Sequence, residues 1–221
     1  MCGRFNLSYS TSDVSVKLPN VLWDFDQAPN FNIAPSQQIS VVSELKGVFT
    51  GSIMQWGIPI TTSDGKTVLM SNTRIERILH KNKWNKSMDN ICFIPASGFY
   101  EWDKFNTEKI PYNVQLRDSE LFLMVGICRQ TSSSLNCSIL TCSARHPLGD
   151  IHDRCPVVLP LNADLNVSNS STRELDFLNA SLELQPQMDL FLTQISTRVN
   201  SVRFNSFECL MEDRTQQIKL F

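Results

Sequence analysis

Short β-rich runs recur along the central part of the chain, and they limit the fold more than any other feature. Each run is rich in β-branched, aromatic or other apolar residues, and turn residues separate it from the next. Asp-Gly within the segment 63–66 is typical of a tight turn between two such runs. The predicted strands are 39–43, 48–58, 68–72, 91–95, 98–102, 112–116, 121–127, 137–144 and 156–160.

Helical periodicity is confined to a few segments. Ile75, Ile78 and Leu79 have helical spacing within 73–82, and we expect further helices at 173–184 and at 186–195. Many strands with few helices predict an α+β fold: one domain around a curled, barrel-like, mostly antiparallel sheet with peripheral helices. We expect this domain to span residues 1–221, with 165–221 as a more helical C-terminal section that begins after a polar stretch at 162–172.

Composition excludes several classes of protein. A hydrophobic content of 42% with 19% charged residues is ordinary for a folded domain, which argues against disorder. Without an apolar run of 18 residues or a signal-peptide pattern, we expect a cytoplasmic or nucleoid-associated protein and no membrane partner. Seven cysteines without CxxC spacing argue against a disulfide framework and a ribbon-type zinc site. A net charge of −2 still allows a local basic patch that binds nucleic acid.

The N-terminal segment Met-Cys-Gly-Arg-Phe favours unusual chemistry. Removal of Met1 would leave Cys2 with a free α-amine, whose pKa of about 7.7–8.0 lies well below that of about 10.4 for lysine. Such an amine forms imines with aldehydes at neutral pH, and the neighbouring thiol can close the imine to a thiazolidine. The structural alternative is that Cys2 only starts a buried strand.

Three later segments carry further candidate groups. Glu101 shares a strand face with Phe99, and apolar surroundings would raise its pKa into the range of a general acid. His152 precedes a buried strand and has arginines nearby in the sequence; it is either a functional or a structural histidine. The Asn72–Arg77 segment lies at a strand-to-helix junction, where amides and a guanidinium can bind phosphate, or where charges simply cap a helix.

Taken in order, these segments resemble one family. MCGRF, NIAP, WG, SNTRIE, PASGFYEW and IHDRCPVVL follow one another across residues 1–160, and this series resembles the SOS response-associated peptidase (SRAP) proteins, also called abasic-site processing proteins. The resemblance implies a barrel-like core that binds single-stranded DNA. It also implies that the N-terminal cysteine traps the ring-opened aldehyde of an abasic site in a covalent crosslink, without cofactor or metal. The section beyond about residue 165 resembles the family only loosely.

Carried over residue by residue, the resemblance assigns roles to ten positions. Cys2 would be the nucleophile and Asn32 would hold the adduct. Glu101 would move protons, and His152 would assist opening of the sugar ring. The residues that would contact DNA are Arg4, Trp56, Asn72, Arg74, Arg77 and Arg154. We expect the protein to act as a monomer.

Two departures and three alternatives accompany this interpretation. Cys155 stands where the family usually has methionine, and Arg145 stands where a small or amide residue is expected. Loss of Met1, by an aminopeptidase or by attack of the Cys2 thiol on the preceding carbonyl, is required for the adduct. The alternatives are a thiol peptidase using Cys2, His152 and Glu101, a non-catalytic single-strand binder, and a zinc site. The zinc ligands would be Cys142, His146, His152 and Cys155.

Overall fold

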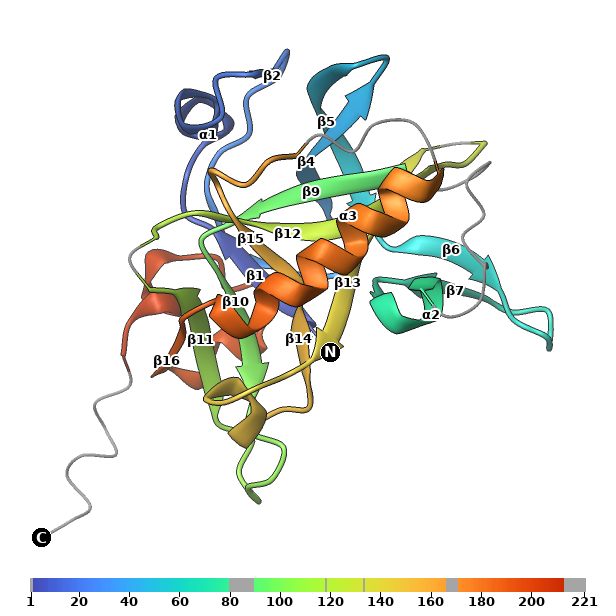
Figure 1. Ribbon diagram of the computed structural model, residues 1–221. Helices are drawn as coiled ribbons and strands as arrows, with labels where there is room; N and C mark the ends of the chain where they lie inside the picture. The colour runs from blue at the N-terminus through green and yellow to red at the C-terminus, as the bar shows by residue number, and fades with distance from the viewer. Residues whose placement is uncertain (1, 80–89, 118, 133, 166–170, 213–221) are drawn as a thin grey trace, which may run out of the picture.

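The fold is described from a computed structural model of the chain (Figure 1). The structure describes residues 2–79, 90–117, 119–132, 134–165 and 171–212. The last three residues of the predicted helix at 73–82 and residues 166–170 of the polar stretch at 162–172 therefore lie outside the described residues, as does Met1. No helix in the described part of the chain is long and apolar enough to cross a membrane.

A five-stranded sheet carries the N-terminal segment in its interior. Its strand order is β16-β11-β10-β1-β3, so that β1 has a hydrogen-bonded neighbour on both sides. Every pairing within this sheet is antiparallel. The strands are β1 (Arg4–Leu7), β3 (Asn30–Ile33), β10 (Gly98–Trp102), β11 (Pro111–Leu116) and β16 (Leu190–Gln194).

The larger, nine-stranded sheet closes on itself. Along the path β14-β13-β12-β9-β4-β5-β2, an additional parallel pairing joins β13 to β5, which completes a ring of β13, β12, β9, β4 and β5. This ring confirms the predicted curled, mostly antiparallel sheet. The strands are β2 (Val21–Leu22), β4 (Gln38–Leu45), β5 (Val48–Trp56), β8 (Asn72–Arg74), β9 (Asn90–Ala96), β12 (Phe122–Gln130), β13 (Leu135–Ser143), β14 (Arg154–Pro156) and β15 (Val158–Pro160).

Apolar strands fill the space between and around the two sheets. In β9 and β12 successive residues are buried on both faces, which explains why these strands read as continuous apolar runs. Phe99 of the smaller sheet meets Phe122 of the larger one edge to face, with ring centroids 6.5 Å apart. Gly126 allows the close approach of β9, because a Cβ there would lie 2.6 Å from a side-chain carbon of Ile94.

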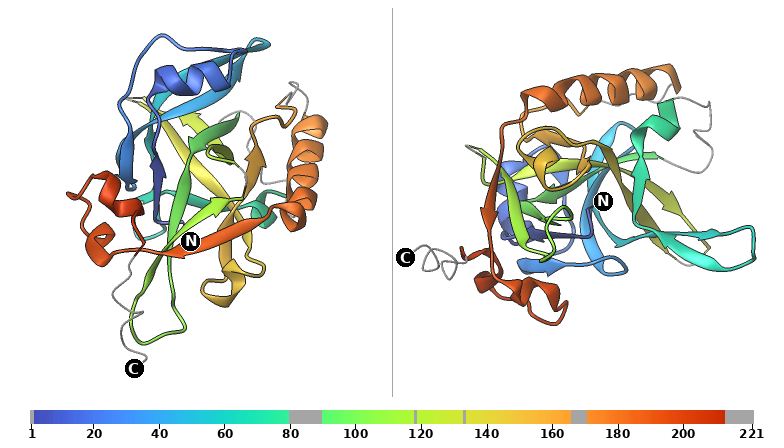
Figure 2. Two further views of the ribbon diagram at one scale, coloured as in Figure 1. Left: turned by 90° about the vertical axis from the view of Figure 1, so that its left-hand side faces the viewer. Right: turned by 90° about the horizontal axis from the view of Figure 1, so that it is seen from below.

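The helices lie outside the sheets. The helix α3 (Ser171–Leu184) runs across the outer face of the larger sheet (Figures 1 and 2), where Phe177 packs against Phe93. Its position confirms the helix predicted at 173–184. The short α1 (Thr11–Lys17), which the sequence analysis did not identify, begins with a capping box between Ser10 and Asp13. The helix α2 (Ile75–Leu79) follows β8 directly.

The helix predicted at 186–195 is wrong. Gln185–Gln187 form a 3₁₀ turn, and residues Leu190–Gln194 form strand β16 on the edge of the smaller sheet. Pairing along the whole of β11 satisfies the backbone of this segment, and that long-range partner outweighs the local helix signal of Pro186. A separate hairpin of β6 (Ile58–Thr61) and β7 (Thr67–Met70) extends from the body (Figure 2), and Gly65 takes the positive φ of its turn.

Candidate active site

Cys2 lies where the two sheets meet. The strand β1, which begins two residues later at Arg4, pairs with β10 of the smaller sheet. The carbonyl of Cys2 accepts a hydrogen bond of 2.8 Å from Nδ2 of Asn72 on β8 of the larger sheet. The side chain of Cys2 is fully buried. The amide oxygen Oδ1 of Asn72 is buried without a hydrogen-bond partner among the described residues. Because Oδ1 of Asn72 lies beside Cys2 and accepts no hydrogen bond from the described residues, it could accept one from a nitrogen donor near Cys2.

Burial controls the state of the Cys2 thiol. Loss of hydration raises the pKa of the thiol well above its ordinary value, and the negative charge of Glu101 raises it further. The sulfur approaches the carbonyl oxygen of Arg4 at 3.6 Å. At neutral pH the group is therefore a thiol, and it needs a base before it can act as a nucleophile.

Glu101 supplies a carboxyl group of suitable acidity. Its side chain projects from β10, is 2% exposed and stands next to the apolar core. Burial raises the pKa of this carboxyl to about 7. Both the acid and the carboxylate are thus populated near neutral pH, which is the condition for moving protons in either direction.

His152 is a basic side chain close to that carboxyl. Its Nε2 lies 3.7 Å from Oε2 of Glu101, and its side chain is 14% exposed. Its Nδ1 lies 3.1 Å from both the backbone nitrogen and the carbonyl oxygen of Arg154, which fixes the ring. Burial lowers the pKa of the imidazole, so that His152 is largely neutral where Glu101 is half protonated. The two groups therefore form a proton-exchanging pair with little net charge.

Arg154 is committed to contacts inside the protein. Its two terminal nitrogens meet the two carboxylate oxygens of Glu76 at 2.8 and 2.9 Å, and one of them also bonds the carbonyl of Thr141. These bonds tie β14 to α2 and β13, and thereby fix the chain that carries His152. The assignment of Arg154 to DNA binding stays a prediction, but its buried guanidinium already has partners.

Asn32 and Arg4 hold the C-terminal part of the chain. The amide nitrogen of buried Asn32 lies 3.2, 2.9 and 2.8 Å from the carbonyl oxygens of Val199, Ser201 and Phe204. Arg4 donates to Oδ1 of Asn32 and to the carbonyl of Val199, at 2.7 Å in each case. These contacts favour structural roles for both side chains. A part for Asn32 in holding an adduct stays untested, and Asn72 occupies the position beside Cys2.

The remaining predicted DNA contacts differ in their accessibility. Trp56 is fully buried, packs edge-on against Phe5 at 5.2 Å and donates from Nε1 to the carbonyl of Ser71, so it offers no free face to a base here. Arg74, at the end of β8, and Arg77, in α2, are both exposed. Arg74 lies beside Thr141 in the parallel pairing of β8 with β13, which places it close to Glu76 and Arg154.

The four residues of the alternative zinc site do not converge. Cys142 and Cys155 face each other across β13 and β14, whereas His146 is exposed and pairs with Asp150 at 2.8 Å. Across the described ranges, no group of three His, Cys, Asp or Glu side chains is arranged to hold a metal ion. Burial raises the pKa of the Cys155 thiol, and the negative charges of Cys142, Glu101 and Cys2 raise it further, so the second thiol lies near the site.

Sequence reasoning missed two relationships. It assigned Asn72 to DNA and did not place it on the Cys2 carbonyl, and it gave Glu76 no partner. Asn72 and Glu76 both belong to the SNTRIE segment. The negative charge of Glu76 in SNTRIE and the positive charge of Arg154 in IHDRCPVVL were the only sequence features that could have indicated their pairing. Backbone acceptors such as the Cys2 carbonyl carry no such signal.

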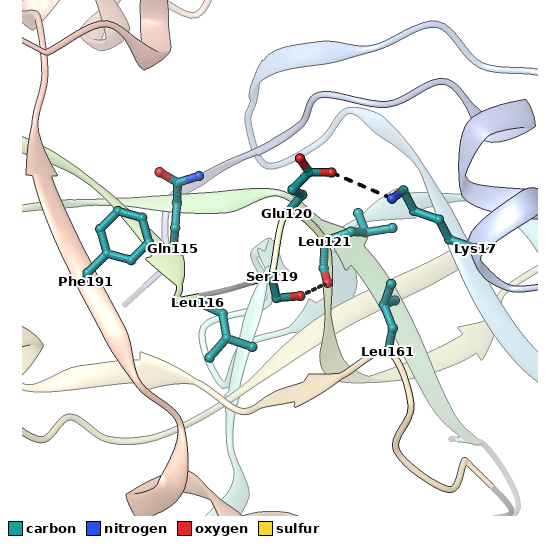
Figure 3. Close-up of a pocket in the computed structure, with 8 residues that line it drawn as sticks. All are labelled: Lys17, Gln115, Leu116, Ser119, Glu120, Leu121, Leu161 and Phe191. Carbon is teal, nitrogen blue, oxygen red and sulfur yellow. Dashed lines mark hydrogen bonds and ion pairs between the residues drawn. The ribbon is translucent and has the colours of Figure 1, made fainter.

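A cavity of about 640 Å³ lies on another part of the surface (Figure 3). Its walls come from α1, the end of β11, the β11–β12 connection and β16, and they include Lys17, Glu120 and Phe191. None of the predicted catalytic or DNA-contacting residues lines it. The candidate chemistry is thus concentrated where β1, β10, β8 and β14 meet.

Comparison with known proteins identifies the fold and the family of the chain. A crystallised protein from Bacteroides thetaiotaomicron has the same fold, with a TM-score of 0.75 at 18% identity, covering 96% of this chain and 100% of that one. The abasic site processing proteins YoqW and YoaM of Bacillus subtilis are 31% and 32% identical to the chain; each alignment covers 95% of it and 99% or 97% of the relative. The family model described as "SOS response associated peptidase (SRAP)" matches residues 1–202. The chain therefore belongs to the SRAP family.

Proposed function

We propose that this protein processes abasic sites in single-stranded DNA by forming a covalent crosslink through Cys2. The observation that carries the proposal is the convergence of Cys2, Glu101 and His152 at one buried site, with Asn72 on the Cys2 carbonyl. Relatives that align over most of the chain are named abasic site processing proteins. The proposal requires that Met1 is removed, so that the α-amine of Cys2 is free.

The first step is opening of the abasic sugar. The ring oxygen must receive a proton and the anomeric hydroxyl must lose one, which yields a hydroxyl group and an aldehyde. Neutral His152 accepts one proton while protonated Glu101 supplies the other, and the 3.7 Å separation of the two groups lets the pair reset.

The second step joins protein and DNA. The amine nitrogen of Cys2 attacks the aldehyde carbon, and the resulting carbinolamine loses water once its hydroxyl is protonated. Glu101, with a pKa of about 7, can donate that proton and then exist as a carboxylate. Loss of water leaves a protonated imine. The carboxylate next takes the thiol proton and the sulfur attacks the imine carbon, which closes a thiazolidine with a neutral N–H and returns Glu101 to its acid form without any external reagent.

Binding of the strand rests on local cations. The net charge of the chain is −2, so an anion track must be local. Exposed Arg74 lies at the end of β8, two residues from Asn72, and is placed to contact a phosphate beside the trapped sugar.

The decisive experiment combines processed protein with a single-stranded oligonucleotide that contains one abasic site. We expect a denaturant-resistant product whose mass equals protein without Met1 plus DNA minus water. Cys2→Ala should abolish this product, and chemical capping of the α-amine should do the same. A crosslink that forms with a capped amine would refute the proposed bond.

The alternatives give different results in the same experiment. A single-strand binder without chemistry would bind the oligonucleotide in a salt-dependent way and leave no stable product. A thiol peptidase would cleave an unrelated peptide in a Cys2-dependent manner even when its amine is capped. Release of Met1 by the protein itself would appear as loss of that residue in purified, aminopeptidase-free protein and would disappear in Cys2→Ala.

A further inference from the structure

We infer that Phe105 is a stacking platform for the base next to the abasic nucleotide. This inference rests on the proposed function and adds to it a base-contacting residue that the family motifs do not include. Among the exposed large apolar side chains of the described residues, only Phe105 and Phe207 are aromatic, at 66% and 63% exposure. Phe207 packs edge-on against Phe31, with ring centroids 6.0 Å apart, whereas the ring of Phe105 is contacted by the ammonium group of Lys104 at 5.2 Å.

The loop that carries Phe105 is attached to the candidate active site. It connects β10, which holds Glu101, to β11, and it lies beside the 3₁₀ turn at residues 148–150 at the bottom of Figure 1. The backbone nitrogen of Lys104 donates to the carbonyl of Ile151, the residue before His152. Lys104 Nζ also pairs at 2.7 Å with Asp153, whose carboxylate lies 3.5 Å from Nδ1 of His152. Phe105 is therefore linked to His152 through two successive side chains.

The backbone of the loop is preorganised, so that the attachment point of the aromatic ring is fixed. Asp103 accepts hydrogen bonds from the backbone nitrogens of Phe105 and Asn106, at 2.9 and 3.1 Å, which fixes the turn. An exposed aromatic ring on a fixed turn loses little entropy when it binds a flat partner. A single exposed phenylalanine is common on protein surfaces, so the case depends on this rigidity and on the contact chain to His152.

The chemistry of the loop suits a base and not a phosphate. The basic side chains Lys104, Lys109 and Arg145 are outnumbered by acidic side chains at positions 103, 108, 150 and 153, so the patch has no positive excess to attract a phosphate. A nucleobase is uncharged and presents an aromatic face. Where a nucleotide lacks its base, each neighbouring base has lost one stacking partner, and an aromatic side chain can replace it regardless of sequence.

The test is a binding cycle that needs no covalent step. Wild-type protein, Phe105→Ala, Phe105→Tyr and the exposure-matched control Phe207→Ala are titrated with a labelled single strand containing a tetrahydrofuran abasic analogue. Matched strands also lack the base on the 5′ side, or on the 3′ side, of the analogue. We expect Phe105→Ala to bind the first strand about tenfold more weakly, with Phe105→Tyr and Phe207→Ala within about twofold of wild type.

Removal of the base that stacks on Phe105 should weaken binding by wild-type protein by the same factor of about ten. On that strand, wild-type protein and Phe105→Ala should then bind with equal affinity. That side is then the stacked side. Equal affinity of wild type and Phe105→Ala, or a difference that persists on both base-deficient strands, overturns the inference. If wild type still crosslinks natural abasic DNA in that case, the proposed function stands and only the platform is lost. If wild type neither binds nor crosslinks, both proposals fail.

Discussion

Glu101 and His152 approach each other to 3.7 Å between Oε2 and Nε2, yet their pKa values move in the directions that keep both side chains neutral. Burial is the main cause of each shift, because it penalises the charged form of both groups. The pair is thus an acid and a base held close together without forming a permanent ion pair.

Replacing Glu101 by Gln should slow crosslinking by about 10²- to 10⁴-fold, the usual contribution of general acid–base catalysis. The wild-type rate should rise as the α-amine is deprotonated and fall at higher pH as Glu101, with a pKa of about 7, loses its proton. Glu101→Gln should lack the falling limb. Single-turnover rates from pH 5.5 to 9 measure both features, and an unchanged profile in the variant would exclude Glu101 as the acid.

The same substitution should stabilise the fold at alkaline pH. The folded-state pKa of Glu101 is raised, so its stabilising contribution is present below its unfolded value of 4.5 and is lost as pH rises through about 7. Glu101→Gln has no such loss, and the stability difference in its favour should grow with pH to about 3 kcal/mol. Most of this difference develops between pH 4.5 and 7, so urea unfolding of both proteins at pH 5, 6, 7 and 8 measures it. His152 is common to both proteins, and parallel curves over this range would contradict the prediction.

Asn32 and Asn72 should separate stability from chemistry. Asn32→Ala leaves the carbonyls of Ser201 and Phe204 without this donor, whereas that of Val199 keeps Arg4. The change should lower the free energy of unfolding by about 2–3 kcal/mol, while the folded fraction still crosslinks. Asn72→Ala should do the reverse, with a slower crosslink and a smaller change in stability. Thermal unfolding and crosslinking rates of both variants at low temperature test the contrast. If Asn32→Ala is stable but unreactive, Asn32 holds the adduct after all.

Replacing Arg154 should lower the stability of the fold more than it weakens binding to DNA. Arg154→Met removes the partner of the Glu76 carboxylate, which is 34% exposed and stays partly hydrated, and should cost about 2 kcal/mol of stability. The double change with Glu76→Met should cost less than the sum of the two single changes, because it removes both charges together. Denaturant midpoints of the four proteins give the coupling energy. Additive losses would show that the pair is energetically inert.

Arg74→Ala should weaken binding to single strands about equally for every sequence. One lost phosphate contact should also reduce the slope of log affinity against log salt by about 0.7. Lys46→Ala, at the turn between β4 and β5, removes an exposed positive charge remote from β8 and serves as the control. A sequence-dependent loss would instead assign Arg74 to a base.

The sequence predicts the strands of this fold well because their apolar content is local information. Runs such as 91–95 and 121–127 are apolar throughout because both of their faces are buried, and this pattern is typical of a strand inside a sheet. The segment 186–195 was misjudged because its strand exists only through pairing with β11 far earlier in the chain. The α1 helix was missed although Ser10 and Asp13 carry its capping signal.

Some parts of the candidate site can likewise be predicted from the sequence and others cannot. Glu101 and His152 stand out as titratable residues in apolar segments, and strand convergence explains their meeting with Cys2. The amide nitrogen of Asn32 bonds backbone carbonyls between Val199 and Phe204. Such contacts cannot be predicted from a pattern of side chains. Burial of Trp56 is likewise a property of packing against Phe5 and is invisible in the dipeptide Trp-Gly.

The interior position of β1 makes the surroundings of this strand depend on residues far along the sequence. Its arginine bonds the carbonyl of Val199, a partner 195 positions later in the chain, and β1 itself is enclosed by β10 and β3. These neighbours come together only when segments that are distant in the sequence meet, and contacts of such high sequence separation form slowly during folding. The environment of Cys2 is accordingly a property of the assembled sheet and not of its own segment.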